Sequence, residues 1–267
     1  MSPVSEGKLR LGGMALRNGL LVHGPTHWAA AVRDREGAII TASGRKPRIA
    51  AVDGVPGVRG VVRLGEAFTV IPLVKRTLPQ ARLPFESRGV LGVAAGASLA
   101  GALLRRRSPG LGGEAAAAVL SLAPAVLALR GGELAAYHGV EHKAIAAYEA
   151  ADDADAADTA KEHDRCGSHL VTPLLASNLA GVLLLRQVVD KPGPVAGAGV
   201  AVASTAAAVE VFAWCERHAG TPLARALRRP GFELQRLIGT REPDERQLEV
   251  GRAALAEILR VEGEASN

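Results

Sequence analysis

Long apolar runs fill the middle of the chain and separate two more polar ends. Four runs rich in Ala, Val, Leu and Gly cover residues 89–104, 110–129, 170–185 and 194–215. A helix needs about 20 apolar residues to cross a bilayer core, with a range of about 17–25. Two runs reach that length, and flanking residues or extended arginine side chains can lengthen the other two. The pattern predicts four membrane helices, and the alternative is an Ala-rich bundle in a soluble protein.

The residues before the first run predict a small β-rich domain. Residues 28–32 and 38–42 resemble two paired strands, and Gly37 can take the positive φ that the turn between them needs. Gly12 and Gly13 are expected in a tight turn.

A connecting helix is predicted between this domain and the first apolar run. Pro56 and Gly57 break the chain, and the residues after them are compatible with a helix up to Pro72. The pattern leaves open whether this helix lies on a membrane or in a soluble core.

The residues after the fourth run predict an amphipathic C-terminal helix. Leu248, Leu255, Ile258 and Leu259 recur at helical spacing after Pro243, so this helix is expected to pack on the rest of the protein. The predicted fold class is therefore mainly α, a multi-span helical membrane protein with a small N-terminal β-rich domain. Residues 1–60 are expected to form a cytoplasmic β-rich domain, and residues 61–88 an amphipathic connecting helix. Residues 89–215 are expected to carry the membrane helices, with a polar loop at 130–169. Residues 216–267 are expected to form a cytoplasmic C-terminal segment.

Composition and charge support a membrane environment. Hydrophobic residues make up 48% of the chain but aromatic residues only 3%, and small apolar residues suit closely packed membrane helices. The net charge is +5, yet the basic residues are scattered and aromatic stacking partners are scarce, so the lipid bilayer and not nucleic acid is the expected partner. Cys166 and Cys215 form no disulfide framework. The first residues lack an apolar core, so no cleavable signal peptide is expected.

The basic residues predict an orientation with one inconsistency. The N-terminal region carries many Lys and Arg and should stay in the cytoplasm, and four crossings return the C-terminal segment there. The arginines at 105–107 then lie outside, against the positive-inside rule. A re-entrant helical hairpin is the alternative that removes this conflict.

The stretch YHGVEHKAIAAYE carries the main candidate chemistry. His138, Glu141 and His142 form an H-x-x-E-H pattern, and positions i, i+3 and i+4 share one face of a helix. Two imidazoles on one face can hold a divalent ion, and a carboxylate beside them can act as a base. Zinc is the expected metal from the ligand types, with Fe²⁺, Mn²⁺ or Ni²⁺ as alternatives. Lys143 is expected to be solvated.

Two sets of residues compete to complete the metal shell. Glu210 lies inside an apolar run and would leave an open, catalytic site. His163 and Cys166 would instead close a four-ligand structural site. Without a metal, the histidines would form ordinary hydrogen bonds, Cys166 would be a small buried hydrophobe, and Glu210 would pair with an arginine such as Arg186.

Several motifs together resemble a known family. GGMALRNG, VPGVRG, YHGVEHKAIAAYE, HDRCGS and RPGFELQRLIGTREPDERQLEV are similar to the YqhQ-like family of bacterial membrane proteins, a domain of unknown function described as predicted metal-dependent enzymes. The resemblance implies a multi-pass protein of the bacterial inner membrane with its histidine motif near the cytoplasmic face. Asn18 and Met14 depart from the family, which usually has glutamate and glutamine there. The family's polar positions fall on His138, Glu141, His142, Glu149, His163, Cys166 and Glu210.

These observations predict a metal-dependent membrane hydrolase. His138 and His142 are the expected ligands, Glu141 is the expected base, and the substrate is a peptide or a lipid-linked group. The first alternative is a membrane scaffold or assembly factor with a structural zinc. The second is a transporter that uses Glu114, Glu210 and the histidines along an ion path.

Overall fold

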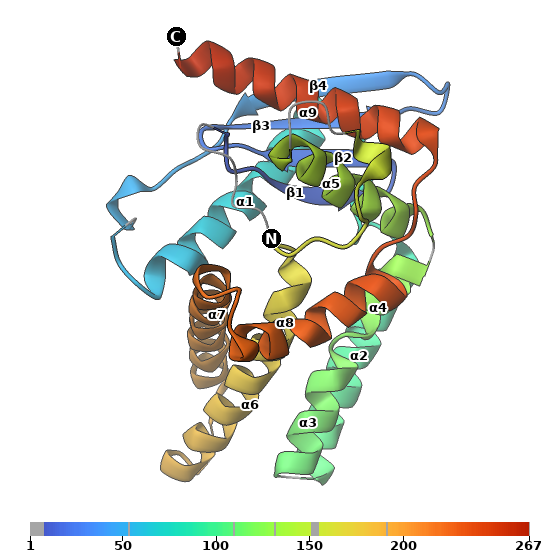
Figure 1. Ribbon diagram of the computed structural model, residues 1–267. Helices are drawn as coiled ribbons and strands as arrows, with labels where there is room; N and C mark the ends of the chain where they lie inside the picture. The colour runs from blue at the N-terminus through green and yellow to red at the C-terminus, as the bar shows by residue number, and fades with distance from the viewer. Residues whose placement is uncertain are drawn as a thin grey trace.

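The chain folds into a head built on a β-sheet and a stalk of long helices (Figure 1). The computed structural model describes residues 8–52, 54–108, 110–130, 132–150, 155–190 and 192–266. The other residues of the chain, including those at its two ends, lie outside the described residues, and so do the parts of the predicted segments that fall on them.

Four antiparallel strands form the sheet in the order β1-β2-β3-β4. The strands are β1 (Gly12–Leu16), β2 (Gly19–His23), β3 (His27–Arg33) and β4 (Ile39–Arg45). The predicted hairpin is β3 and β4, and Gly37 in its turn has a φ of 91°. The expected N-terminal β-rich region is therefore confirmed. Gly12 and Gly13 lie inside β1 and not in a turn, so that prediction is wrong.

Alternate residues of the strands face two separate cores. Leu21 and Trp28 pack on one face of the sheet with Val70 and Val74 from α1 (Val58–Thr77). Leu20 and Val22 pack on the other face with residues of α5 (Glu133–Glu149) and α9 (Glu245–Ser266). This two-residue alternation is what a sheet covered on both faces requires. The amphipathic C-terminal helix is α9, and Leu248 and Ile258 bury its apolar face as predicted.

The helix α1 continues through Pro72 to Thr77, and the prediction that it would end at Pro72 is wrong. A proline inside a helix costs roughly 3 kcal/mol. Val70 and Val74 are fully buried on either side of it, and burying such a side chain contributes about 1.5–3 kcal/mol. Packing on the sheet therefore offsets the proline, and this half of α1 belongs to the core of the head.

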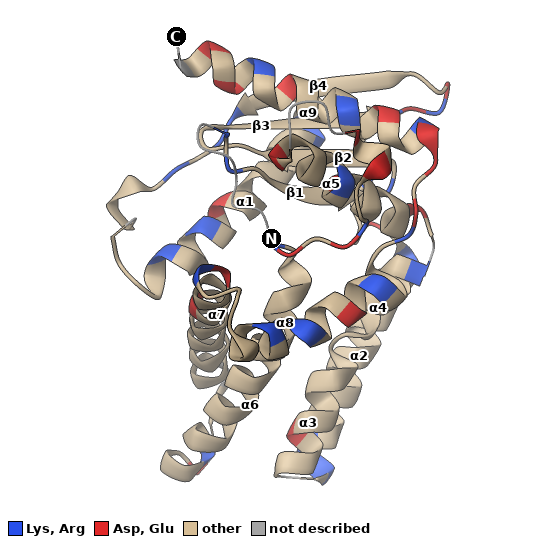
Figure 2. Ribbon diagram, viewed as in Figure 1, with Lys and Arg blue, Asp and Glu red and all other residues tan. Residues whose placement is uncertain are grey.

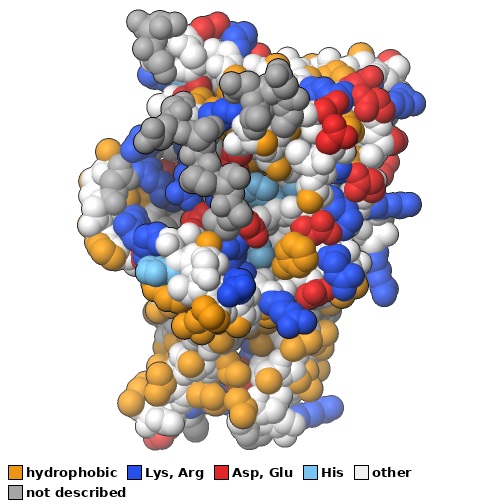
Figure 3. Space-filling view, in the orientation of Figure 1, with side chains coloured by type: hydrophobic (Ala, Val, Ile, Leu, Met, Phe, Trp, Pro, Cys, Tyr) orange, Lys and Arg blue, Asp and Glu red, His pale blue; other side chains and the backbone are white. Residues whose placement is uncertain are grey.

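The stalk consists of two antiparallel helical hairpins that point away from the sheet (Figure 1). Its helices are α2 (Arg88–Arg107), α3 (Leu111–Leu120), α4 (Ala123–Arg130), α6 (Val171–Val188) and α7 (Pro194–Arg217). Figure 2 shows that charged residues gather in the head, and Figure 3 shows that apolar side chains cover the stalk. A shorter helix, α8 (Pro222–Leu234), crosses between the two parts.

Three segments of the stalk are long and apolar enough to cross a membrane, by length and composition: Leu111–Arg130, Gly167–Val188 and Val195–Arg217. This indicates membrane association. The first predicted span forms α2, which packs in the same stalk but is not among these segments. Its last three residues are arginines, which leave a shorter apolar stretch.

A buried acid links the two hairpins of the stalk. Glu114 on α3 is only 3% exposed and pairs with Arg105 at 2.9 Å and with Arg186 of α6 at 2.5 Å. Arg186 therefore pairs with Glu114 and not with Glu210. A carboxylate inside an apolar bundle is costly unless cations lie against it, so this cluster fixes how the hairpins dock.

Replacing the acid should loosen the stalk. We expect Glu114→Gln to lower the free energy of unfolding by about 1–4 kcal/mol, between the values of exposed and fully buried ion pairs. Thermal unfolding in detergent measures this effect. The control is Glu233→Gln, which removes an exposed ion pair between Glu233 on α8 and Arg236 just after it. This variant should leave the midpoint of thermal unfolding nearly unchanged. Equal midpoints for the two variants would contradict a linking role for Glu114.

Candidate metal centre

The helix α5 places the H-x-x-E-H motif between the sheet and the residues that follow α8. Gly139 allows the backbone of this later segment to approach, because a Cβ there would lie 2.3 Å from the carbonyl oxygen of Arg241. The amide of Arg241 donates to the carbonyl of Ala135 at 2.9 Å. This close contact brings the carbonyl of Gly239 over the first histidine of the motif.

Backbone carbonyls hold both imidazoles from behind. The Nδ1 atom of His138 lies 2.7 Å from the carbonyl oxygen of Gly239, and Nδ1 of His142 lies 2.6 Å from that of Lys161. Because a carbonyl only accepts hydrogen bonds, each Nδ1 carries the proton. Each Nε2 then carries its lone pair toward the other side of the ring, as in the usual second-shell arrangement of metal-ligating histidines.

Cys166 meets the two histidines at the same point. Its Sγ lies 3.3 Å from Nε2 of His138, and the ligand atoms of His138, His142 and Cys166 all lie within 4.8 Å of one another. A tetrahedral zinc ion separates its nitrogen and sulfur ligands by about 3.5 Å. Nε2 of His142 is buried and has no hydrogen-bond partner among the described residues. These three residues therefore form a possible metal-binding cluster.

Burial sets the protonation states of the cluster in the absence of a cation. Burial, followed by the charge of His138, lowers the pKa of His142 to about 2, so this imidazole is neutral and able to bind a metal. Burial, followed by the charge of Glu141, raises the pKa of the Cys166 thiol to about 11. A thiol in this state becomes a thiolate ligand only when a cation lies beside it.

Glu141 lies in a pocket of about 330 Å³ that also exposes His138 and Cys166. Its carboxylate accepts a hydrogen bond from the backbone amide of Ala15, and burial raises the pKa of the carboxyl. A Cβ on Gly13 would approach Cγ of Glu141 to 2.6 Å. Gly13 is thus the sequence signal for this contact, although we interpreted it, together with Gly12, as part of a turn.

The structure does not bring Glu210 to the cluster. Its carboxylate accepts from the backbone amide of Gly57 at 2.9 Å and pairs with Arg59 at 3.1 Å, at the start of α1. His163 lies nearer, with its ring centroid 5.7 Å from that of His142. Its Nε2, however, is 3.5 Å from Glu149, and it is not one of the three clustered residues.

Two residues that sequence reasoning missed hold the loops around the cluster. Lys143 is 3% exposed and not solvated as predicted, and its Nζ donates to the carbonyls of Ala157 and Thr159 at 3.0 and 2.6 Å. This fixes the segment just before Lys161, whose carbonyl contacts His142. Gln235 is fully buried, accepts from the amide of His163 at 2.8 Å and donates to Oγ of Ser168 at 2.8 Å. It therefore braces the loop that carries the cysteine.

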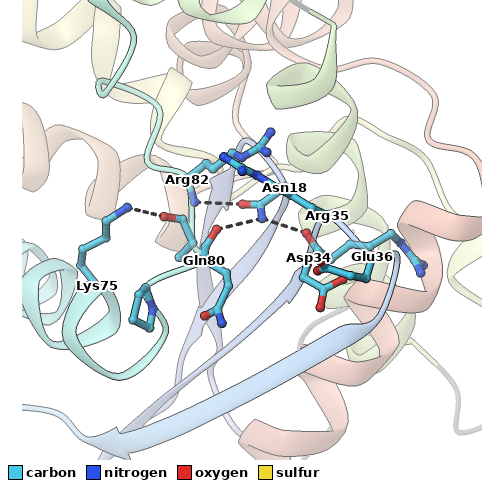
Figure 4. A pocket seen from close by; sticks show the side chains of 10 residues that line it. Asn18, Asp34, Arg35, Glu36, Lys75, Gln80 and Arg82 are labelled. Carbon is cyan, nitrogen blue, oxygen red and sulfur yellow. Dashed lines mark hydrogen bonds between the residues drawn. The ribbon is translucent and has the colours of Figure 1, made fainter.

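Met14 and Asn18, the two positions that differ from the family resembled in sequence, differ in their relation to the cluster. Met14 lines the pocket of Glu141. Asn18 lies instead in a separate pocket of about 470 Å³, where it donates to the carbonyls of Arg33 and Gln80 and accepts from the amide of Arg82 (Figure 4). The role of Asn18 is therefore to join the β1–β2 turn to the residues after α1.

Comparison with known proteins supplies a family similarity without an activity. The model of a family described as proteins of unknown function (DUF1385) matches residues 133–261, which run from α5 into α9. The match includes His138, His142 and Cys166. No curated protein and no solved structure matches the chain.

The contact between β1 and the carboxylate gives a matched pair of variants. We expect Gly13→Ala to lower the free energy of unfolding by about 1–3 kcal/mol, because the added methyl group overlaps Glu141. A Cβ at Gly12 would meet nothing within 4 Å, so Gly12→Ala is the control and should be neutral or stabilising. Thermal unfolding of both variants measures the difference. Equal stability would mean that the carboxylate is free to move away.

Proposed function

We propose that the protein is a metal-dependent membrane hydrolase whose divalent ion, with zinc as the expected metal, is bound by His138, His142 and Cys166. The observation that carries this proposal is the buried Nε2 of His142, which has no hydrogen-bond partner in the described part of the chain and lies beside two other ligand atoms. A buried nitrogen in that state costs about 1–3 kcal/mol, and a metal ion satisfies it. Two imidazoles and a thiolate favour zinc over harder cations.

The open side of the cluster supports catalysis more than a structural role. Three protein ligands and an adjoining pocket are typical of catalytic zinc sites, whereas structural sites have four protein ligands. A zinc ion held there would activate water and polarise a carbonyl or phosphoryl oxygen. Glu141 lines the same pocket and is positioned to accept the proton from the attacking water. The hydrogen bonds to Gly239 and Lys161 keep both imidazoles oriented during the reaction.

A lipid-linked substrate suits the path into the pocket better than a peptide does. The pocket shares Pro84 and Leu134 with a second cavity of about 200 Å³, which Val90 of α2 and Leu127 of α4 also line. Both helices belong to the stalk, and these residues lie at their head-facing ends. An amphiphile in the bilayer would reach Glu141 along these apolar side chains, with Arg17 and Glu133 of the same cavity available to its polar part.

We place the protein in the bacterial cytoplasmic membrane, with the head and both ends of the chain in the cytoplasm. Residues 1–60, 61–88 and 216–267 then form the cytoplasmic part, and residues 89–215 carry the spans. The unknown substrate and the bilayer are the partners in this proposal, and nucleic acid has no part in it.

A structural zinc in a membrane scaffold is the alternative. The observation in its favour is His163, whose ring lies 5.7 Å from that of His142 and would close the shell after a side-chain rotation. A site that uses only the Cys166 thiol and the His138 imidazole, without a metal, is less favoured than either zinc site. The reason is that burial raises the pKa of this thiol to about 11.

Metal content tests the proposed site directly. We expect about one zinc ion per chain in detergent-purified protein, measured by inductively coupled plasma mass spectrometry, and loss of that zinc in His138→Ala/His142→Ala. His218→Ala removes an exposed histidine that stacks on Trp214 and should keep the metal. The site assignment fails if the parent binds no metal even after incubation with zinc, or if the double variant binds as much as the parent.

Glu141→Gln separates the enzyme from the scaffold. We expect this variant to keep its zinc but to lose hydrolysis of a lipid-linked substrate by about 10²–10⁴-fold, the usual contribution of a general base. Complementation of a deletion strain gives a readout that needs no known substrate. Full complementation by Glu141→Gln, together with failure of His138→Ala/His142→Ala, would favour the scaffold.

A further inference from the structure

An arginine-lined pocket lies beside the loop that carries Cys166 and shares no lining residue with the pocket of Glu141. It has a volume of about 380 Å³ and forms where α8 meets the residues before α6. Gly231 makes this close docking possible, because a Cβ there would lie 2.7 Å from Cα of His169. The lining side chains that matter here are Asp164, His169, Arg225, Arg228, Arg229 and Phe232.

The pocket lies at the level where the stalk meets the head. His169 precedes α6, and Ala219, which also lines the pocket, follows α7. Figure 2 shows the basic segments of α8 across the head-facing end of the stalk, and Figure 3 shows basic side chains directly above the apolar band. With the stalk in a bilayer, this level corresponds to the lipid headgroups.

The charges of the pocket favour an anion. Arg228 is buried and pairs with Asp164 at 2.6 Å, which fixes its guanidinium group. Arg225 and Arg229 are exposed, lie four positions apart on one flank of α8, and make no ion pair with any described residue. The lining of the pocket therefore contains three positively charged guanidinium groups and one negatively charged carboxylate. Guanidinium groups bind phosphate oxygens with paired hydrogen bonds, which makes phosphate the matching ligand.

Apolar side chains on the same helix favour a lipid as the source of that phosphate. Leu223 is 58% exposed, Phe232 is 39% exposed, and Leu237 just after α8 is 69% exposed. A short helix with exposed leucines and arginines is typical of a segment that lies in the membrane interface. Phe232 belongs to both features, since it lines the arginine pocket and is partly exposed.

We propose that this pocket binds the phosphate headgroup of an anionic glycerophospholipid, with Arg225 and Arg229 as its main contacts. Basic pockets between helices at the cytoplasmic face are known to select anionic lipids. The bound lipid would hold α8, and through it Gln235 and the loop of Cys166, against the membrane surface. The lipid site does not require the metal chemistry proposed above.

Lipid-dependent stability tests this site. We expect phosphatidylglycerol added to detergent-purified protein to raise the midpoint of thermal unfolding in a saturable way, while phosphatidylcholine and inorganic phosphate at equal concentration do not. Arg225→Gln/Arg229→Gln should weaken the apparent affinity for phosphatidylglycerol at least about tenfold. The control is Arg252→Gln/Arg260→Gln, two exposed arginines on α9 in the head, which should respond like the parent.

Three results would overturn the proposal. Equal stabilisation by phosphatidylcholine would mean that the effect is not selective for charge. Stabilisation by inorganic phosphate equal to that by phosphatidylglycerol would assign the pocket to a soluble anion. An unchanged affinity in Arg225→Gln/Arg229→Gln would place the lipid elsewhere. The zinc content of this variant should match that of the parent, so failure here is distinguishable from failure of the metal site.

Discussion

The packing of α5 against the sheet, α9 and the backbone of Arg241 is the constraint on which the site depends. The sheet and α9 cover one side of this helix, and Gly139 admits the backbone of Arg241 on another. Only then do the carbonyls of Gly239 and Lys161 reach the two imidazoles from behind. A helix that packed more loosely would leave both rings free to rotate, and the ligand atoms would no longer share one point.

The same packing makes the cluster costly without a cation. A buried polar group with no partner costs about 1–3 kcal/mol, and here a neutral imidazole nitrogen lies beside a protonated thiol. Structural zinc sites in small peptides provide roughly 10–16 kcal/mol of binding free energy. A bound ion would therefore change the cluster from a local weakness into a crosslink between α5 and the loop of Cys166.

Local patterns predicted the elements well and the partners of polar side chains poorly. The strands of the hairpin, the apolar runs and the face of α9 depend on periodicity, which the chain displays directly. The i, i+4 spacing likewise predicted that His138 and His142 would meet. Glu210 instead contacts the amide of Gly57, which is 153 positions away, and spacing along the chain contains no information about such a pair. The prediction that α1 ends at Pro72 failed for the same reason, because packing of this helix on the sheet outweighed the local effect of a proline.

The head is assembled from segments far apart along the chain, which orders its biosynthesis. The turn between β2 and β3 is closed by Glu262, whose carboxylate accepts from the amide of Thr26 over a separation of 236 positions. All of the stalk is translated between these two residues. The face of the sheet that packs on α9 therefore stays partly uncovered while the stalk is translated. The carbonyl of Gly239, which orients His138, is likewise made only after the stalk, so this histidine reaches its final position late in synthesis.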